Sequence, residues 1–295
     1  MDRLEIPGIS RPEDVIAQLD AVGYLAEDGL ATAVFLCMRM GRPLFLEGEA
    51  GVGKTSLAPA LAQIAHADLF RLQCYEGLDA AQALYDWDFP RQLLRLRVTE
   101  ASGGIDPDAV ERDLYDRRFL IARPLLRVIE TSPSVLLVDE IDRADDEFEA
   151  FLLEVLSDFA VTVPELGTIT ASTAPLVVLT SNRTREVHDA LKRRCLYHWL
   201  DHPSFDREVA IIRRRLPDAT AHLAESVAHA AAALRRRDLL KAPGIAESID
   251  WAEALLTLGA TTVDPGLAAR TLGAVLKHRE DQAQVLSSGL DTLMP

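Results

Sequence analysis

The chain has 295 residues and a formal net charge of −15, with 48% hydrophobic and 26% charged residues. This composition indicates a soluble globular protein with a large core and a second, smaller domain. The excess of acidic residues argues against nucleic acid as a partner. No apolar stretch approaches the length that spans a bilayer, and the first residues do not resemble a signal peptide. We therefore expect a cytoplasmic protein without a transmembrane segment, and leave peripheral association with a membrane open.

Cys37, Cys74 and Cys195 are the three cysteines, and they lie far apart in the chain. Their spacing fits neither a disulfide framework nor a zinc site. We interpret them as small buried hydrophobic residues.

Two helices are predicted first, one that opens at residues 10–13 and runs to about residue 22, and one at residues 28–40. The pattern from Ser10 to Glu13 is typical of a capping box, and Gly41 stops the second helix. A short apolar strand then leads into Gly-x4-Gly-Lys-Thr at residues 48–55, and a helical pattern follows to about residue 66. A strand before this motif and a helix after it are the context of a phosphate-binding loop.

The residue types in this loop predict a site for a nucleoside triphosphate. Its glycines let backbone N–H groups approach phosphate oxygens, and the N-terminus of the following helix favours an anion. Lys54 supplies a positive charge for the β- and γ-phosphates, and the Thr55 hydroxyl is a ligand for Mg²⁺. The predicted nucleotide-binding residues in the loop are Gly48, Glu49, Ala50, Gly51, Val52, Gly53, Lys54, Thr55 and Ser56.

A second strand is predicted at residues 69–74. Residues 75–100 concentrate aromatic and acidic side chains without a clear period, and both a loop-based binding surface and simple packing are open for them. A turn at residues 102–107 and helices at 108–119 and 123–130 follow.

A buried strand at residues 135–138 ends in Asp139 and Glu140. In a phosphate-loop enzyme the first carboxylate at such a strand end belongs to the Mg²⁺ site, and the second can polarise the attacking water. Asp139 is therefore predicted to bind nucleotide and metal together with Thr55, and Glu140 to be the catalytic base. We interpret the next acidic residues as helix N-cap groups without a chemical role; they are Asp142, Asp145, Asp146 and Glu147.

The remaining elements of this domain follow in order. An amphipathic helix is predicted at residues 145–159, a hairpin at 160–164 and 168–171, and a buried strand at 175–182 that ends in Asn182. This order places the Asn182 amide where it could orient a water molecule beside Glu140. A helix at 184–194 ends in Lys192, Arg193 and Arg194, and a last strand occupies 195–200.

A break at residues 201–204 suggests a domain boundary. We predict an α/β nucleotide-binding domain at residues 1–202 and a domain of four or five short helices at 203–295, because Ala, Leu, Arg and Glu dominate the second part.

With these parts in place, residues 20–260 resemble the AAA+ ATPases, and within them the MoxR-like group. The resemblance rests on residues 48–55, 137–144, 179–182 and 190–194 and on the hairpin between them. More narrowly, residues 75–77, 90–94 and 180–186 look like the CoxD-type branch, which is associated with maturation of the molybdenum-copper centre of carbon monoxide dehydrogenase.

The resemblance implies roles for particular residues. Lys54 and Thr55 match Walker A, Asp139 and Glu140 match Walker B, and Asn182 matches sensor 1. Arg194 matches the arginine finger, which acts on the nucleotide of a neighbouring subunit; Arg193 could hold that role instead, and Arg143 could bridge to the neighbour. Residues 243–248 lack the usual sensor 2 arginine, for which Arg235 or Arg270 could substitute.

The family also implies a fold and a function. The fold is a three-layer P-loop NTPase domain with a parallel sheet and a helical lid. The function is ATP hydrolysis with Mg²⁺ in a homo-oligomeric ring, a hexamer, that remodels a client metalloenzyme during cofactor assembly, with a von Willebrand A-domain protein as a further partner. A P-loop small-molecule kinase and a non-hydrolysing nucleotide-dependent scaffold are the alternatives.

Overall fold

The computed structural model describes residues 2–101 and 112–294. The chain divides into two compact units. The first comprises Met1–Gln18, Glu27–Glu47 and Leu57–His198, and the second comprises Leu19–Ala26, Gly48–Ser56 and Trp199–Pro295. The domain boundary that we placed at residue 202 stays a prediction.

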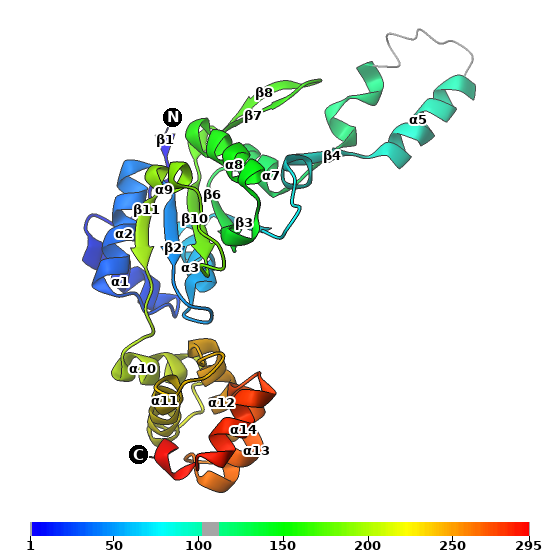
Figure 1. Ribbon diagram of the computed structural model, residues 1–295. Helices are drawn as coiled ribbons and strands as arrows, with labels where there is room; N and C mark the ends of the chain where they lie inside the picture. The colour runs from blue at the N-terminus through cyan, green and yellow to red at the C-terminus, as the bar shows by residue number, and fades with distance from the viewer. Residues whose placement is uncertain (1, 102–111, 295) are drawn as a thin grey trace. The chain divides into compact units, whose positions relative to one another are not determined.

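A five-stranded sheet forms the centre of the first unit, in the order β11-β2-β10-β6-β3 (Figure 1). Neighbouring strands from β2 to β3 run parallel. The carboxyl ends of these strands therefore meet at one edge, where ligands of parallel α/β sheets bind. The strands are β2 (Leu44–Glu47), β3 (Asp68–Gln73), β6 (Ser134–Asp139), β10 (Leu176–Ser181) and β11 (Leu196–Trp199).

Both faces of this sheet are covered. All residues of β2, β6 and β10 are buried, although successive side chains of a strand point to opposite faces. Leu136 and Val138 belong to a core that also contains residues of α7 and α8, while Val135 and Leu137, on the other face, are equally buried. Apolar side chains on both faces explain why the sheet forms a middle layer between helices.

The flanking helices are close to those predicted. They are α1 (Pro12–Ala21), α2 (Asp28–Met40), α3 (Lys54–Ala65), α7 (Pro124–Glu130), α8 (Asp146–Asp158) and α9 (Asp189–Arg194). Gly41 ends α2 in the left-handed conformation, with φ of 65°. Asp14 rather than Glu13 caps the start of α1, because its carboxylate accepts hydrogen bonds from the Ser10 N–H and hydroxyl. The last helix begins at Asp189, five residues later than predicted.

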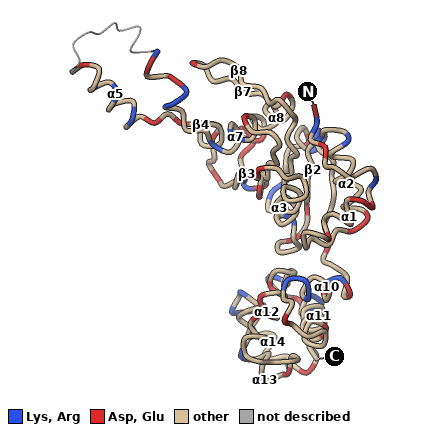
Figure 2. Tube along the Cα trace, turned by 180° about the vertical axis from the view of Figure 1, so that it is seen from behind, with Lys and Arg blue, Asp and Glu red and all other residues tan. Residues whose placement is uncertain are grey.

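The segment without a clear period is not a loop. It forms α4 (Ala80–Leu84), β4 (Tyr85–Trp87) and α5 (Phe89–Ala101), and β4 pairs with β5 (Leu120–Ala122). In Figure 1 this segment extends from the sheet, and Figure 2 marks acidic and basic residues along it. Phe89, Leu93, Leu94 and Val98 of α5 are exposed. These apolar side chains of α5 therefore do not contribute to the core of the first unit.

The neighbouring predictions fall partly outside the described residues. The turn predicted at 102–107 and the first four residues of the helix predicted at 108–119 lie there, while residues 112–114 are helical. Residues 117–119 form a short 3-10 helix, η1 (Arg117–Phe119), which leads into β5.

The hairpin is confirmed as β7 (Ala160–Val163) and β8 (Gly167–Thr170), with Gly167 at φ of 83°. Separately, β1 (Asp2–Arg3) pairs with β9 (Thr173–Ala174). A second 3-10 helix, η2 (Ile141–Arg143), directly follows β6 and Glu140.

The second unit contains the predicted helical region. Its helices are α10 (Phe205–Arg215), α11 (Ala221–Arg235), α12 (Ile245–Thr257), α13 (Pro265–Val275) and α14 (Arg279–Ser287), followed by η3 (Asp291–Leu293). Trp251 is fully buried in a core built mainly of Leu, Ala and Val. Among the described residues, none of the helices combines the length and apolar composition needed to cross a bilayer.

Candidate functional site

The predicted phosphate-binding loop joins β2 directly to α3. Gly51 and Gly53 have φ of 80° and 98°, a region that side chains with a Cβ rarely adopt. A methyl group on Gly48 would lie 2.3 Å from the Leu200 carbonyl oxygen. The glycines at these three positions are therefore needed for the conformation of the loop and for the close approach of the backbone at Leu200.

Lys54 lies inside the curve of the loop. Its side chain is 5% exposed, and Nζ donates to the carbonyl oxygens of Gly48 at 2.8 Å and Glu49 at 2.6 Å. A buried ammonium group beside the N-terminus of α3 makes this region favourable for an anion. The role of Lys54 as a phosphate ligand stays a prediction.

The start of α12 contacts the same loop within the second unit. The backbone N–H groups of Ile245 and Ala246 donate to the Gly51 carbonyl oxygen at 3.0 Å and 3.3 Å. On another side of the loop, the Glu49 carboxylate lies 3.0 Å from His202 Nε2. Both contacts link the phosphate loop to the helical region.

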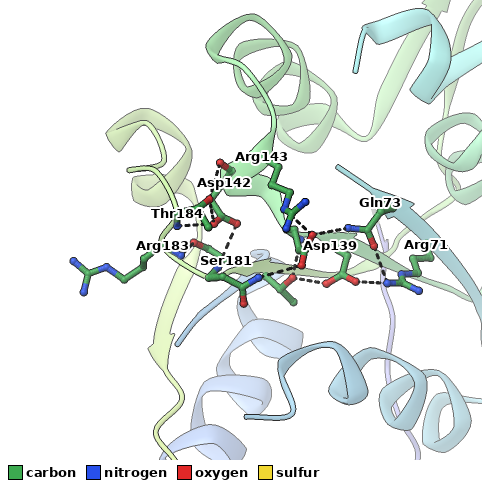
Figure 3. Close-up of polar contacts among 11 residues, drawn as sticks. Arg71, Gln73, Asp139, Asp142, Arg143, Ser181, Arg183 and Thr184 are labelled. Carbon is green, nitrogen blue, oxygen red and sulfur yellow. Dashed lines mark hydrogen bonds and ion pairs between the residues drawn. The ribbon is translucent and has the colours of Figure 1, made fainter. Parts of the chain in front are cut away.

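Asp139 is the last residue of β6 and Glu140 follows it, at the carboxyl edge of the sheet, where Figure 3 shows a network of polar side chains. The Thr180 hydroxyl donates to Asp139 at 2.6 Å and accepts the Glu140 N–H at 2.9 Å. Arg71, from β3, donates to the other oxygen of Asp139 at 2.5 Å. The Asp139 carboxylate, 3% exposed, is thus fixed by groups from two neighbouring strands.

Glu140 stands in the left-handed region, with φ of 56°. One carboxylate oxygen accepts from Asn182 Nδ2 at 3.1 Å. The other accepts from Gln73 Nε2 at 3.2 Å and pairs with Arg143 Nε at 2.9 Å. The structure therefore brings together the predicted base and the predicted amide, and adds a charged partner for the base.

Three residues of this network had not been predicted for the site: Arg71, Gln73 and Thr180. Arg71 and Gln73 reach the site because the pairing of β3 with β6 places Gln73 opposite Asp139. This pairing register cannot be read from a single sequence. Thr180 did carry a signal, because it is a hydroxyl residue in an otherwise apolar buried strand.

The sequence from residue 43 to residue 195 matches the family model of the AAA domain, dynein-related subfamily, over just more than half of the chain. The chain belongs to the dynein-related AAA family. It therefore contains an AAA-type ATPase domain, for which ATP and Mg²⁺ are the expected ligands.

Solved structures similar to this AAA protein include the RuvB Holliday junction branch migration motor of Thermotoga maritima, at 16% identity and a TM-score of 0.45, covering 88% of this chain and 68% of that chain. A proline-to-glycine variant of the same motor gives 16% identity and a TM-score of 0.48, covering 92% and 73%. These likenesses concern the fold alone. No curated protein sequence is significantly similar to the chain.

The donor chemistry of this AAA domain suits Mg²⁺. Among the described residues no three His, Cys, Asp or Glu side chains group as a metal site, and Mg²⁺ is usually bound by one or two carboxylates together with phosphates and water. The Asp139 carboxylate and the Thr55 hydroxyl are hard oxygen donors of this kind. We therefore assign Mg²⁺ to these two residues as a prediction.

Arg194 closes α9 of the AAA domain, and it makes a contact within its own chain. Its Nη1 donates to the Ser157 hydroxyl of α8 at 2.7 Å. Arg42 donates to the carbonyl oxygens of Arg193 and Arg194 and so fixes the end of the helix. These three arginines line one surface pocket.

The two arginines considered as sensor 2 substitutes make local contacts. Arg235 forms a two-pronged pair with Glu208, at 2.6 Å and 2.7 Å, and donates to the Pro243 carbonyl oxygen. Arg270 donates to the Gly266 carbonyl oxygen of its own helix at 3.2 Å. Arg235 thus has a structural role in the helical region.

Proposed function

We propose that this AAA domain hydrolyses ATP, with Glu140 as the base for the attacking water and Asn182 as the amide that orients it. The 3.1 Å hydrogen bond between the Asn182 amide and the Glu140 carboxylate carries this proposal. Lys54 and residues 48–56 hold the phosphates, and Thr55 and Asp139 hold Mg²⁺. Bound Mg²⁺ supplies neutralisation of the phosphate charge.

The contacts of Glu140 suit a base that keeps its orientation. Asn182, Gln73 and Arg143 together hold both carboxylate oxygens. Phosphoryl transfer depends mainly on positioning and on electrostatic stabilisation, so a fixed carboxylate is favourable.

Glu140→Gln tests the proposal. The amide cannot accept a proton, so we expect kcat to fall by about a hundredfold or more while ATP still binds. Phosphate release measures kcat, and calorimetric titration of ATP with Mg²⁺ measures binding.

The matched control is Glu147→Gln, at an exposed acid at the start of α8, which should leave kcat unchanged. Normal turnover by the Glu140→Gln protein would defeat the assignment of the base. If the protein were instead a small-molecule kinase, the wild-type protein would transfer the γ-phosphate of ATP to an added acceptor molecule rather than to water.

We also propose that the active form is a homo-oligomeric ring, a hexamer, in which Arg194 reaches the nucleotide of the next subunit. The family supports this arrangement, and Arg194 stands at the end of a short helix whose side chains line a surface pocket. Arg193, one position earlier, is the alternative finger.

For the biological role, we propose remodelling of a client metalloenzyme during cofactor assembly. The support is the likeness of residues 75–77, 90–94 and 180–186 to the CoxD-type branch of MoxR-like ATPases. An affinity-tagged Glu140→Gln protein, loaded with ATP in a native extract, should retain a molybdoenzyme subunit. Retention of unrelated proteins only would contradict the role without affecting the ATPase assignment.

A further inference from the structure

Asp142 is a buried acid for which the proposed chemistry has no use. Its exposure is 2%, and it is not the cap of α8, because Asp145 accepts the Phe148 N–H at 2.8 Å in that position. A carboxylate is rarely buried this deeply without several partners. Its partners therefore indicate what it does.

The Asp142 carboxylate accepts hydrogen bonds from Asn182 and Thr184, which lie just after β10. One oxygen accepts the Asn182 N–H at 3.2 Å. The other accepts the Thr184 N–H at 2.9 Å and the Thr184 hydroxyl at 2.7 Å. The carboxylate thus holds both ends of a tight turn, Asn182 and Thr184, with Arg183 between them. Figure 3 labels Asp142, Arg183 and Thr184.

This turn needs to be held. Arg183 has φ of 57°, a conformation that costs a residue with a Cβ roughly 1 kcal/mol or more and persists only where surrounding contacts impose it. The conformation of Arg183 turns the N–H groups of Asn182 and Thr184 toward the same carboxylate. Without Asp142, the turn would keep the hydrogen bond from the Arg183 N–H to the Ser181 hydroxyl at 3.0 Å, but the N–H groups of Asn182 and Thr184 would lose their shared acceptor.

We propose that Asp142 is the positioning residue for Asn182: it clamps the strained turn so that the Asn182 amide faces Glu140. The inference rests on the proposed roles of Asn182 and Glu140 in hydrolysis. Asp142 touches neither the nucleotide nor the water in this scheme, and acts only through the turn.

The test is a double-mutant cycle of Asp142→Ala and Asn182→Ala, with kcat from phosphate release and the ATP dissociation constant from calorimetry. Displacing a catalytic group by about 1 Å can cost roughly 100-fold in rate. We expect each single variant to lose between about tenfold and a hundredfold in kcat, with ATP affinity unchanged within about twofold. Because Asp142 acts through Asn182, the double variant should be no slower than the slower single variant.

Glu149 provides a matched control. It is 1% exposed, and it contacts the segment between β10 and α9 farther along the chain than Asp142 does. It accepts the His188 N–H at 2.7 Å and pairs with Arg185. Its removal should disturb stability comparably without reaching Asn182. We therefore expect the effects of Glu149→Ala and Asn182→Ala on kcat to multiply.

The outcomes separate this inference from the function on which it rests. If Asn182→Ala keeps the wild-type kcat, the role of Asn182 and the inference both fail. If Asn182→Ala is slow while Asp142→Ala is fast, or if the two effects multiply, the inference alone is overturned. Should Asp142→Ala fail to fold, Asp142→Asn replaces it in the cycle, because its amide keeps the shape but presents N–H groups to the N–H groups of the turn.

Discussion

Thr180 links the Asp139 carboxylate, at the end of β6, to the backbone N–H of Glu140, and its hydroxyl can be tested alone. Valine has nearly the same shape but cannot accept the Glu140 N–H or donate to Asp139, contacts now made at 2.9 Å and 2.6 Å. Because Thr180 is 1% exposed, we expect Thr180→Val to lower the free energy of unfolding by about 1–3 kcal/mol. Urea denaturation measures the change.

A threonine on the hairpin is the control. Thr170, on β8, is exposed, so Thr170→Val should change the free energy of unfolding by less than about 0.5 kcal/mol. Equal effects of the two substitutions would show that the Thr180 hydroxyl does not stabilise the site.

The three cysteines make a pH-dependent prediction. Burial raises the pKa of Cys74 and of Cys195 to about 12, and it also raises the pKa of Cys37. The thiolate is the reactive form, so iodoacetamide at pH 8 should leave all three thiols of the folded protein unmodified and should label them in urea. Mass spectrometry counts the labels, and rapid labelling of the folded protein would contradict the burial.

The same pKa values fix how stability should change in alkaline solution. The unfolded thiols lose protons near the ordinary value of 9.0, whereas Cys74 and Cys195 hold theirs to about 12 when folded. Between these values the folded state binds more protons, so rising pH favours unfolding. Their contribution to stability is present below pH 9 and is lost as the pH rises toward 12.

The sequence located some site residues better than others. Asp139, Glu140 and Asn182 each follow an apolar strand, and parallel strands bring such ends to one edge. Arg71 and Gln73 lie on β3, whose exposed and buried residues alternate, and they read as ordinary surface residues. Asp142 was interpreted as a cap because acids cluster there, and only its contacts with Asn182 and Thr184 revealed another role.

At the scale of elements, the start of α12 and the phosphate loop meet through two glycines. A methyl group on Gly244 would lie 2.8 Å from the Ala50 carbonyl oxygen and from backbone atoms of Gly51. Backbone atoms cannot rotate away, so Gly244→Ala should displace α12 and weaken its hydrogen bonds to Gly51. We expect the free energy of unfolding to fall by about 1–3 kcal/mol, as for other overpacked sites.

Gly273 is the matching control in the same unit. It lies inside α13, and a methyl group there would have only a side-chain atom of Gln282, 3.9 Å away, as a neighbour. Gly273→Ala should therefore raise the free energy of unfolding by about 0.5–1 kcal/mol. Urea denaturation measures both changes in the free energy of unfolding. If they have opposite signs, contact with the loop, and not the loss of a glycine, causes the effect of Gly244→Ala.

Elements with strong patterns were predicted well, and elements without a buried face were not. The apolar runs of β6 and β10 and the glycine after α2 are local signals. By contrast, residues 75–100 showed no clear period in the sequence. Within them, α5 exposes Phe89, Leu93, Leu94 and Val98. The pairing of β4 with β5 joins residues more than thirty positions apart, and no local sequence pattern predicts it.

At the scale of the whole molecule, the proposed ring predicts how two defective variants should behave when they are mixed. Arg194→Ala protein keeps Glu140 but lacks the finger, and Glu140→Gln protein keeps the finger but lacks the base. Each should be nearly inactive alone. In a head-to-tail ring, some subunits with an intact base will sit beside a neighbour with an intact Arg194.

Mixing the two proteins should therefore restore activity. With equal amounts and random assembly, half of the subunits have the base and half of their neighbours have the finger, which gives about a quarter of the wild-type rate. Phosphate release after mixing, with sedimentation to confirm assembly, measures it. A mixture as inactive as its components would place Arg194 outside the neighbour's site. Arg193→Ala in the same mixing experiment decides between the two arginines, because only the residue that reaches across the interface can be supplied by the other subunit.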